Sequence, residues 1–289
     1  MRKKNCVRRL LALFLSLALL ALAGCAVGER PSSAAAVTDE PFDGLEVTVL
    51  DAGKADAILL TTAESAVLID AGEKGFGKTI LAYLEEQGVE KLDYLIVTHF
   101  DKDHVGGAAK VINNISVGTV LQSNSPKDSD EYEKYVKALA NAGIEPVTVR
   151  ETLTFTLGGV TYTVDPPVRE TYADDPSNNS SLIVSVVNGA DSFLFTGDAQ
   201  TARLAELLDG DVSGVDVLKL PHHGQDEPLL DALLSATRPA YAVITSSDEE
   251  PESAATVAAL ERAGATVLLT RNGAVTLRSG GNGVQVLEE

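Results

Sequence analysis

Short apolar runs recur along the chain and are separated by polar turns that contain glycine, aspartate or asparagine. Runs of this kind predict β-strands. In the first two thirds of the chain we expect strands at 45–50, 57–61, 66–69, 93–98, 145–150, 153–157, 160–164, 181–187 and 192–196. Apolar residues at helical spacing predict helices over 77–87, 106–113, 129–142 and 199–208.

The last third of the chain alternates between the two patterns. Strands are expected at 215–218, 241–245, 265–269 and 274–277, and helices at 226–236 and 252–263. Runs of strands followed by alternating helices and strands, twice over, predict two packed sheets flanked by helices, which is an α/β fold. The length of this region suits one large core, so we expect a single domain over 44–289.

The N-terminus has the pattern of a targeting segment. Five basic residues within 2–9 precede an uncharged apolar run over 10–22, which is too short for a comfortable membrane span. Residues 1–25 are therefore expected to be a signal peptide. Leu22-Ala23-Gly24-Cys25 resembles a bacterial lipobox, which implies cleavage before Cys25 and a lipid anchor on it. The alternative is an ordinary secretory signal that is cut nearby.

Residues 26–43 are rich in Ala, Ser, Pro and acidic residues and show no apolar periodicity, so they are expected to be a flexible linker. The prediction is then an exported lipoprotein of the bacterial cell membrane, with its domain on the extracytoplasmic side. The only cysteines are Cys6 and Cys25, both within the signal. The domain therefore has neither a disulfide nor a thiolate metal site available.

The charge balance is strongly acidic. The chain has 23 basic and 42 acidic residues and a formal net charge of −19. Removal of the five basic residues in the signal leaves a charge of −24. A charge of this sign keeps an exported domain soluble and argues against broad electrostatic attraction to nucleic acid.

The four histidines of the chain lie in two short clusters, each after an apolar run. His99 and His104 share the first cluster with Asp101 and Asp103, and His222-His223 form the second. A single histidine is usually a surface or packing residue. Several ionisable groups that face one another would repel or lose solvation without a cation, however. The two clusters together predict a metal site built from imidazole and carboxylate ligands.

These clusters and four other segments resemble a known family. The pattern His-x-Asp-x-Asp-His-x-Gly-Gly over 99–107 is followed by Thr196-Gly197-Asp198 and then by Pro221-His222-His223-Gly224. Together with segments 50–57, 68–72 and 178–182, this resembles the metallo-β-lactamase fold. More narrowly, it is similar to the soluble domain of ComEC-type competence proteins in a free-standing lipoprotein form. The resemblance covers about 44–280 and implies an αββα four-layer sandwich.

The resemblance implies roles for individual residues. Metal ligands are expected at His99, Asp101, Asp103, His104, Asp198 and His222. Catalytic roles are expected for Asp103, His223 and Asn179, and Asp70 could orient a ligand histidine. His222 is favoured over His223 as the ligand because adjacent side chains at a strand end diverge, which leaves His223 to contact substrate or move a proton. Substrate contacts are expected from Asn178, Ser181, Lys54 and Lys102, with Lys219 as a further candidate.

Two departures from zinc hydrolases affect the expected cofactor. Asp101 stands where those enzymes commonly have a second histidine, and no histidine lies between 104 and 222. The resulting oxygen-rich site favours Mn²⁺ or Mg²⁺, with Zn²⁺ possible, as one or two ions. The resemblance implies a metal-dependent phosphodiesterase or nuclease that acts on DNA. The alternatives are a hydrolase of a small cyclic ester or amide and a non-catalytic metal-binding lipoprotein. The sequence identifies no protein partner.

Overall fold

The computed structural model describes residues 42–287. The predicted signal peptide, the anchor residue Cys25 and nearly all of the predicted linker lie outside the described residues. Within 42–287, none of the helices has the length and apolar character needed to cross a membrane.

The first sheet contains eight strands in the order β15-β14-β1-β2-β3-β4-β5-β6. Their bounds are β1 Leu45–Val49, β2 Ile58–Thr61, β3 Ala66–Ile69, β4 Lys91–Val97, β5 Ser116–Gln122, β6 Val147–Thr148, β14 Val275–Ser279 and β15 Val284–Leu287. Strands β3, β4, β5 and β6 run parallel, and the others pair antiparallel. Strand β14 thus pairs with β1, with Val47 opposite Leu277, and β15 pairs with the other side of β14.

The second sheet contains seven strands in the order β13-β12-β11-β10-β9-β8-β7. Their bounds are β7 Leu153–Leu157, β8 Val160–Asp165, β9 Ile183–Asn188, β10 Asp191–Phe195, β11 Val217–Lys219, β12 Tyr241–Ile244 and β13 Thr266–Leu269. Strands β10 to β13 are parallel, and β7, β8 and β9 form an antiparallel meander that leads into β10.

Side chains that point to alternate faces of the strands pack into three separate hydrophobic cores. In β1, Val47 and Val49 face the other sheet, where Phe193 and Phe195 of β10 meet them in the central core. The intervening Leu194 of β10 points to the opposite face and packs under helices. Because successive side chains of a strand point to opposite faces, both sheets bury both of their faces.

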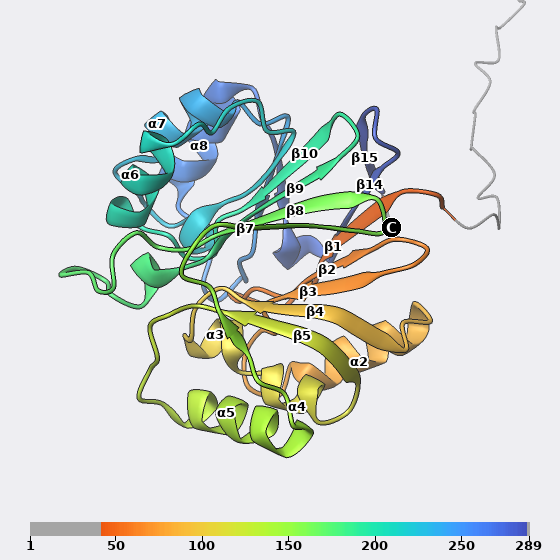
Figure 1. Ribbon diagram of the computed structural model, residues 1–289. Coiled ribbons are helices and arrows are strands. Elements are labelled where there is room, and N and C mark those ends of the chain that lie inside the picture. The colour runs from red at the N-terminus through yellow and green to blue at the C-terminus, as the bar shows by residue number, and fades with distance from the viewer. Residues whose placement is uncertain (1–41, 288–289) are drawn as a thin grey trace, which may run out of the picture. The chain divides into compact units, whose positions relative to one another are not determined.

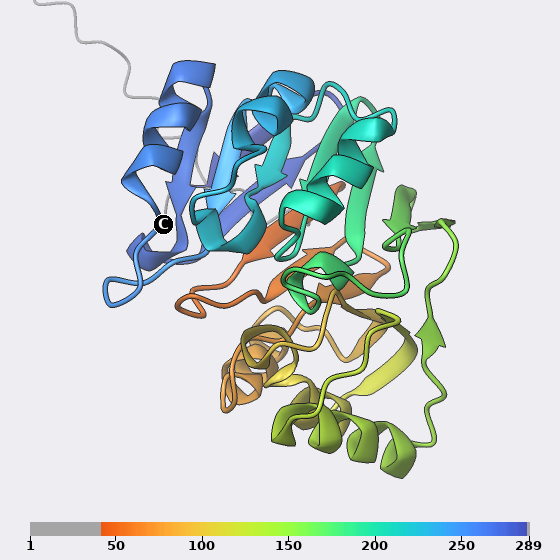
Figure 2. The same cartoon turned by 90° about the vertical axis from the view of Figure 1, so that its left-hand side faces the viewer.

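Helices cover the outer face of each sheet (Figure 1). Helices α2 (Gly77–Glu86), α3 (Lys102–Val105), α4 (Ala108–Ile112) and α5 (Asp130–Ala142) lie on the first sheet. Helices α6 (Thr201–Asp209), α7 (Leu230–Thr237) and α8 (Ala254–Ala263) lie side by side on the second (Figure 2). The four layers confirm the predicted αββα sandwich. Short 3₁₀ turns occur at η1 (Asn178–Ser180), η2 (Pro221–Gly224) and η3 (Thr270–Asn272).

The structure differs from the predicted elements at three places. Strands β5 and β15 were not predicted, because each mixes apolar residues with Ser, Thr, Gly or Gln at partly exposed positions. The helix predicted over 106–113 corresponds to α4, which begins only after Gly107, whereas the short helix α3 that ends before Gly106 was not predicted. The chain approaches a neighbouring loop closely here: a Cβ on Gly107 would lie 2.2 Å from the carbonyl oxygen of Ala71.

Candidate metal centre

The candidate centre lies where the carboxyl ends of strands from both sheets meet. Strand β3 ends just before Asp70, and β4 leads into the segment from His99 to His104. From the second sheet, β10 leads to Asp198 and β11 leads to His222 and His223. Loops at the carboxyl ends of parallel strands are the usual place for ligands in α/β proteins. The topology therefore brings together residues that are more than 100 positions apart in the sequence.

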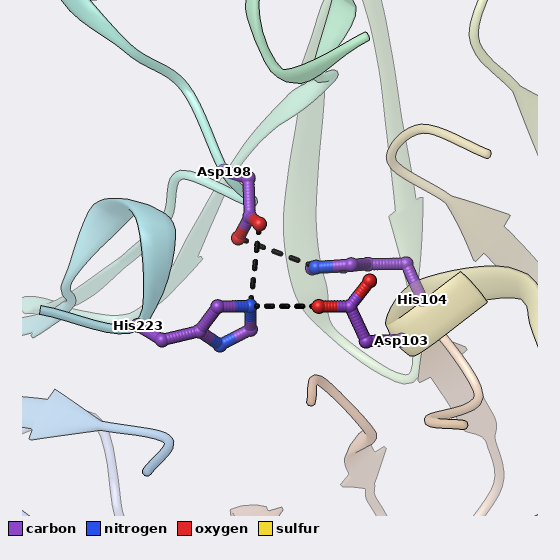
Figure 3. Close-up of side chains that lie close together, drawn as sticks. All are labelled: Asp103, His104, Asp198 and His223. Atoms are coloured by element: carbon purple, nitrogen blue, oxygen red, sulfur yellow. Dashed lines mark ion pairs between the residues drawn. The ribbon is translucent and has the colours of Figure 1, made fainter. Parts of the chain in front are cut away.

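Four side chains form the core of the centre (Figure 3). The Nε2 atom of His104 lies 3.2 Å from Oδ1 of Asp198. The Nε2 atom of His223 lies 3.2 Å from Oδ2 of Asp198 and 3.4 Å from Oδ2 of Asp103. Asp198 therefore lies between the two imidazoles, and all four residues offer ligand atoms within 4.8 Å of one another. One carboxylate pair and one imidazole pair, contributed by both sheets, can surround a single cation.

Three residues at the centre have a left-handed backbone although none is glycine. The φ angles are 56° at Asp70, 47° at His222 and 55° at His223. Each such conformation costs of order 1–3 kcal/mol and persists only where the surrounding structure requires it. The turn after β11 accordingly directs His223 into the core, whereas a simple strand end would not.

The imidazole of His104 is fixed from behind by Asp70. Its Nδ1 atom lies 2.8 Å from Oδ2 of Asp70, which is fully buried. The same carboxylate accepts hydrogen bonds from the backbone N–H and the hydroxyl of Thr98, at 2.8 and 2.6 Å. With Nδ1 directed at Asp70, Nε2 of His104 is directed at Asp198 and is the atom that a metal would bind. This contact matches the orienting role that was expected for Asp70.

The imidazole of His99 is also held through its Nδ1 atom. Its Nδ1 lies 3.1 Å from Oγ1 of Thr98, whose proton is already donated to Asp70. The hydroxyl oxygen of Thr98 can therefore accept from Nδ1 of His99, which leaves Nε2 as a lone pair. That Nε2 lies 4.0 Å from both Asp101 Oδ1 and Asp198 Oδ2.

A second buried chain of contacts fixes His223. Its Nδ1 lies 2.9 Å from the hydroxyl of Thr245, which donates to Oδ1 of Asp56 at 2.7 Å. The other oxygen of Asp56 pairs with the ammonium of Lys219 at 2.6 Å. All four side chains are at most 1% exposed. Sequence reasoning missed Thr245, because it does not lie beside a histidine in the sequence.

The unpaired atoms of this cluster test whether a cation fits. The Nε2 atoms of His99, His104 and His223 and the Oδ1 atom of Asp198 are buried and have no hydrogen-bond partner among the described residues. Their contacts lie within ion-pair distance but lack hydrogen-bond geometry. A buried polar atom without a partner costs about 1–3 kcal/mol. Convergent imidazole and carboxylate lone pairs are the donor set of a divalent metal, so these residues fit such an ion.

The charges within the cluster shift the pKa values of its members in opposite directions. Burial lowers the pKa of His99 to about 4, and the neighbouring His104 adds to the effect. Burial, the largest single cause, opposes the charged form of His104 and His223, but the surrounding carboxylates, Asp198 foremost, together raise both pKa values. Burial would raise the pKa of Asp198, yet the two imidazoles hold it well below its usual range. Without a metal, His104 and His223 therefore keep protons that a metal would displace.

Asp101 is engaged by a residue that sequence reasoning missed. The ammonium of Lys127, in the segment between β5 and α5, lies 2.5 Å from Oδ1 of Asp101. The hydroxyl of Ser177 donates to the same oxygen. Burial would raise the pKa of Asp101, but His99 and Lys127 lower it. Lys127 lies in a polar loop of the sequence with no adjacent motif, so only the fold reveals its position.

The preference for His222 as ligand is not supported by the geometry. His222 lies outside the cluster of four, is partly exposed, and has its Nδ1 atom 3.2 Å from Nε2 of Gln200. His223 takes the inner place instead. The sequence argument correctly expected the two rings to diverge, but the left-handed turn after β11 reverses which of them points inward.

Asn179 and Ser181 are also placed differently from expectation. Asn179 is buried, accepts from the backbone N–H of Arg203 at 3.0 Å, and donates to the carbonyl of Asp174 at 2.9 Å. Its amide thus ties η1 to the start of α6. Ser181 is fully buried and accepts from the backbone N–H of Asp198 at 3.2 Å. Ser181 therefore supports the loop that carries Asp198, and both side chains are engaged in hydrogen bonds within the protein.

The three lysines that were expected to contact the substrate differ in their exposure and in their ion-pair partners. Lys102 is largely exposed and lies 3.9 Å from Glu73. Lys54 lies 3.9 Å from Glu250, and its charge lowers the pKa of His222, although burial is the larger cause of that shift. Lys219 is buried against Asp56 and cannot reach a substrate. Asn178 remains partly exposed in η1.

The family comparison agrees with this geometry. The profile of the Metallo-beta-lactamase superfamily matches residues 50–246, which include every residue of the cluster. Among solved structures, the metallo-β-lactamase fold protein YhfI of Bacillus subtilis has a TM-score of 0.55 at 13% identity, covering 79% of this chain and 96% of that one. CmlA, a diiron β-hydroxylase from Streptomyces venezuelae, has a TM-score of 0.52 at 17% identity, covering 83% and 55%. At these identities the likeness concerns the fold alone.

Curated relatives come from competence and recombination proteins. Competence protein ComA of Neisseria gonorrhoeae is 30% identical over 233 residues, which are 79% of this chain and 30% of that protein. Recombination protein 2 of Haemophilus influenzae is 28% identical over 214 residues, covering 71% and 25%. ComE operon protein 3 of B. subtilis is 27% identical over 221 residues, covering 69% and 28%.

The aligned region thus spans between a quarter and a third of each of these relatives. Their similarity confirms the expected resemblance to ComEC-type competence proteins. With its four layers, its histidine and aspartate loops at the strand ends and the profile match over 50–246, this chain belongs to the metallo-β-lactamase superfamily.

Proposed function

We propose that this chain is a metal-dependent phosphodiesterase that cleaves DNA outside the cytoplasmic membrane. The observation that carries the proposal is the oxygen-rich ligand set, in which Asp103 and Asp198 stand with His104 and His223. Two carboxylates around one centre favour Mn²⁺ or Mg²⁺, which are the usual cofactors of phosphoryl-transfer sites. When bound, such an ion would lower the pKa of a water molecule and polarise a phosphoryl oxygen.

The residues around the centre would have separate roles in binding the ion, orienting its ligands and contacting the substrate. Asp103, His104, Asp198 and His223 would hold the ion, and Asp70 and Thr245 fix the two imidazoles so that Nε2 faces it. His222 lies beside this group but outside it. Because Gln200 donates to its Nδ1, the proton of His222 resides on Nε2. Burial lowers the pKa of His222 and so favours the neutral ring, whose Nε2–H can donate a hydrogen bond to a phosphate oxygen.

The relatives support DNA as the substrate. Two of the three curated proteins are named for competence or recombination, and the alignments cover between 69% and 79% of this chain. Positive charge near the centre comes from Lys127 at Asp101 and from Lys54 near His222. These lysines would contact backbone phosphates, a contact that weakens as salt concentration rises.

The acidity of the chain favours the second candidate, a hydrolase of small cyclic esters or amides. The net charge is −19, and a cavity of about 530 Å³ beside His222 is lined by Asp174, Asp175, Asp226 and Glu227. An acidic wall would repel a polyanion and would admit a small neutral substrate. The third candidate, a non-catalytic lipoprotein with a structural metal, requires that the centre bind metal without turnover.

Substrate profiling of the purified full-length protein separates the three candidates. Single-stranded DNA, double-stranded DNA, bis(p-nitrophenyl) phosphate, a lactone and a β-lactam are each tested with Mn²⁺, Mg²⁺ and Zn²⁺. The proposal expects cleavage of DNA and of the small phosphodiester with Mn²⁺ or Mg²⁺, and loss of both activities in Asp103→Ala. Turnover confined to the lactone or β-lactam would establish the second candidate. Metal binding with no turnover of any substrate would establish the third.

Salt dependence adds a check on the substrate class. Lys127→Ala should raise KM for DNA more than for the small phosphodiester, because only the polymer presents several phosphates. Lys110→Ala is a matched control, since the ammonium of this lysine in α4 hydrogen-bonds Asn114, away from the centre. If DNA cleavage is insensitive to salt and both variants treat the two substrates alike, nucleic acid is the wrong substrate.

A further inference from the structure

Lys127 holds the position at Asp101 where a second cation would bind. Its ammonium lies 2.5 Å from Oδ1 of Asp101 and 3.5 Å from the hydroxyl of Ser177. Ser177 also donates to that carboxylate oxygen. One carboxylate oxygen of Asp101 is thus engaged by two donors of this chain, one of which carries a full positive charge.

His99 and Asp198 also lie near this position and carry atoms that can bind a cation. Nε2 of His99 is buried and lacks a hydrogen-bond partner among the described residues. It lies 4.0 Å from both Asp101 Oδ1 and Asp198 Oδ2. His99 and Asp101 nevertheless stand outside the group of four around His104 and His223. The molecule therefore contains a complete four-residue set and an adjacent incomplete one, and Lys127 lies at the incomplete set.

The segment that carries Lys127 is anchored to the loop opposite. The hydroxyl of Ser123, just after β5, donates to the carbonyl of Ser180 at 2.6 Å. This bond links the start of the 123–128 segment to η1, which is itself tied to α6 through Asn179. The ammonium is therefore presented from a supported segment that faces Ser177, although the lysine side chain itself keeps 37% of its surface exposed.

Electrostatics makes the two cations competitors. A divalent ion at Asp101 and an ammonium 2.5 Å from the same oxygen would repel strongly in a partly buried position. A lysine is a compact point charge that can replace an ion at a carboxylate without any coordination requirement.

We propose that the Lys127 ammonium takes the place of a second cation at Asp101, so that this chain holds one divalent ion, at Asp103, His104, Asp198 and His223. The inference rests on the metal centre of the proposed function and specifies its occupancy. Lys127 then supplies the second positive charge that a phosphate would meet beside the ion. His99 and Asp101 support the centre without holding a metal of their own.

Metal stoichiometry tests this inference without reference to activity. The full-length protein and its variants are loaded with Mn²⁺, freed of excess ion, and analysed by elemental analysis, native mass spectrometry and electron paramagnetic resonance. We expect one Mn²⁺ per chain in the wild type, with the spectrum of an isolated ion. Lys127→Ala should bind two ions and show a spin-coupled pair, whereas Lys127→Arg, which keeps the charge, should bind one. The double variant Lys127→Ala with Asp101→Ala should return to one.

The outcomes separate this inference from the function on which it rests. Two ions in the wild type, or one ion in Lys127→Ala, would overturn the role of Lys127 and leave the metal-dependent function standing. Absence of any bound ion in the wild type, or full retention of metal in His223→Asn, would overturn the centre itself. Circular dichroism on each variant establishes that a change in stoichiometry does not arise from unfolding.

Discussion

Asp70 and His104 form a buried carboxylate–imidazole pair in which Oδ2 and Nδ1 are 2.8 Å apart. Asp70→Asn tests the pair while keeping the backbone, since asparagine tolerates the left-handed conformation found at this position. Loss of such an orienting carboxylate typically weakens metal affinity about 10–100-fold. We expect a decrease of that size in Mn²⁺ affinity, measured by competition with a chelator.

Asp175→Asn is the matched control for this variant. Asp175 also has a positive φ, of 42°, but is exposed and makes no contact with a histidine of the centre. Its metal affinity should equal that of the wild type. Equal affinities for Asp70→Asn and the wild type would mean that Asp70 does not orient a ligand.

His222 and His223 provide a second matched pair, because they are adjacent and share a left-handed backbone. His223→Asn should weaken Mn²⁺ binding by about tenfold or more, since it removes a ligand. His222→Asn should bind Mn²⁺ normally and lower kcat/KM by about tenfold or more, because it removes the Nε2–H donor to a phosphate oxygen. Calorimetry and steady-state kinetics measure the two effects separately, and the reversed pattern would return the ligand role to His222.

Thr245 links His223 to Asp56 through one hydroxyl. Thr245→Val keeps the shape but removes a donor to Asp56 and an acceptor for His223, which should cost about 1–3 kcal/mol of unfolding free energy. Metal affinity should fall as well. Thr237→Val, at a buried threonine that bonds only the carbonyl of Leu233 in α7, should lose stability without losing affinity. If both variants keep wild-type affinity, Thr245 has no part in positioning His223.

Proton release should accompany metal binding. Interaction with Asp198 raises the pKa values of His104 and His223 against the opposing effect of burial, so the metal-free protein retains protons on them above pH 6.5. A metal needs the Nε2 lone pairs, so binding must expel these protons and affinity should rise with pH through the raised pKa values. Calorimetry at pH 7 in buffers of different ionisation enthalpy measures the number released. An observed binding enthalpy that is independent of buffer would contradict this prediction.

The anchor is tested on Cys25. The apolar run that ends in Leu22-Ala23-Gly24-Cys25 predicts acylation at this residue, and more than one acyl chain is needed for stable membrane attachment. Cys25→Ser should abolish incorporation of labelled fatty acid and leave the precursor uncleaved. Cys6→Ser, within the same signal, is the control and should be processed normally. A mature chain of unmodified mass that begins elsewhere would refute the anchor.

The fold could be predicted from sequence because its strands alternate cleanly or are wholly apolar, as in Val47, Val49 and Phe193 of the central core. The strands that were not predicted lie at partly exposed positions, where polar residues such as Thr119 and Gln285 are tolerated. The spacing of apolar residues along a strand reflects which side chains are buried, so the pattern is weakest in strands that are only partly buried.

The sequence predicted the kind of site, a metal centre of histidine and aspartate residues, better than it predicted the individual ligands. Asp103, His104 and Asp198 lie in local motifs whose spacing indicates a metal. The choice between His222 and His223 depends on one left-handed turn, which no spacing reveals. Lys127 and Thr245 come from loops that only the packed sheets bring near the motifs, so local sequence carries no sign of their role.

The pairing of β1 with β14 has a consequence for how the chain folds. Every residue proposed to hold the ion has been synthesised once residue 223 is made. The first sheet gains Leu277 as a partner for Val47 only 54 residues later. Contacts between positions this far apart in sequence close slowly. Metal capture and completion of the first sheet are therefore separable events, and a chain truncated before β14 would show whether the ion stabilises an intermediate that still has an open sheet edge.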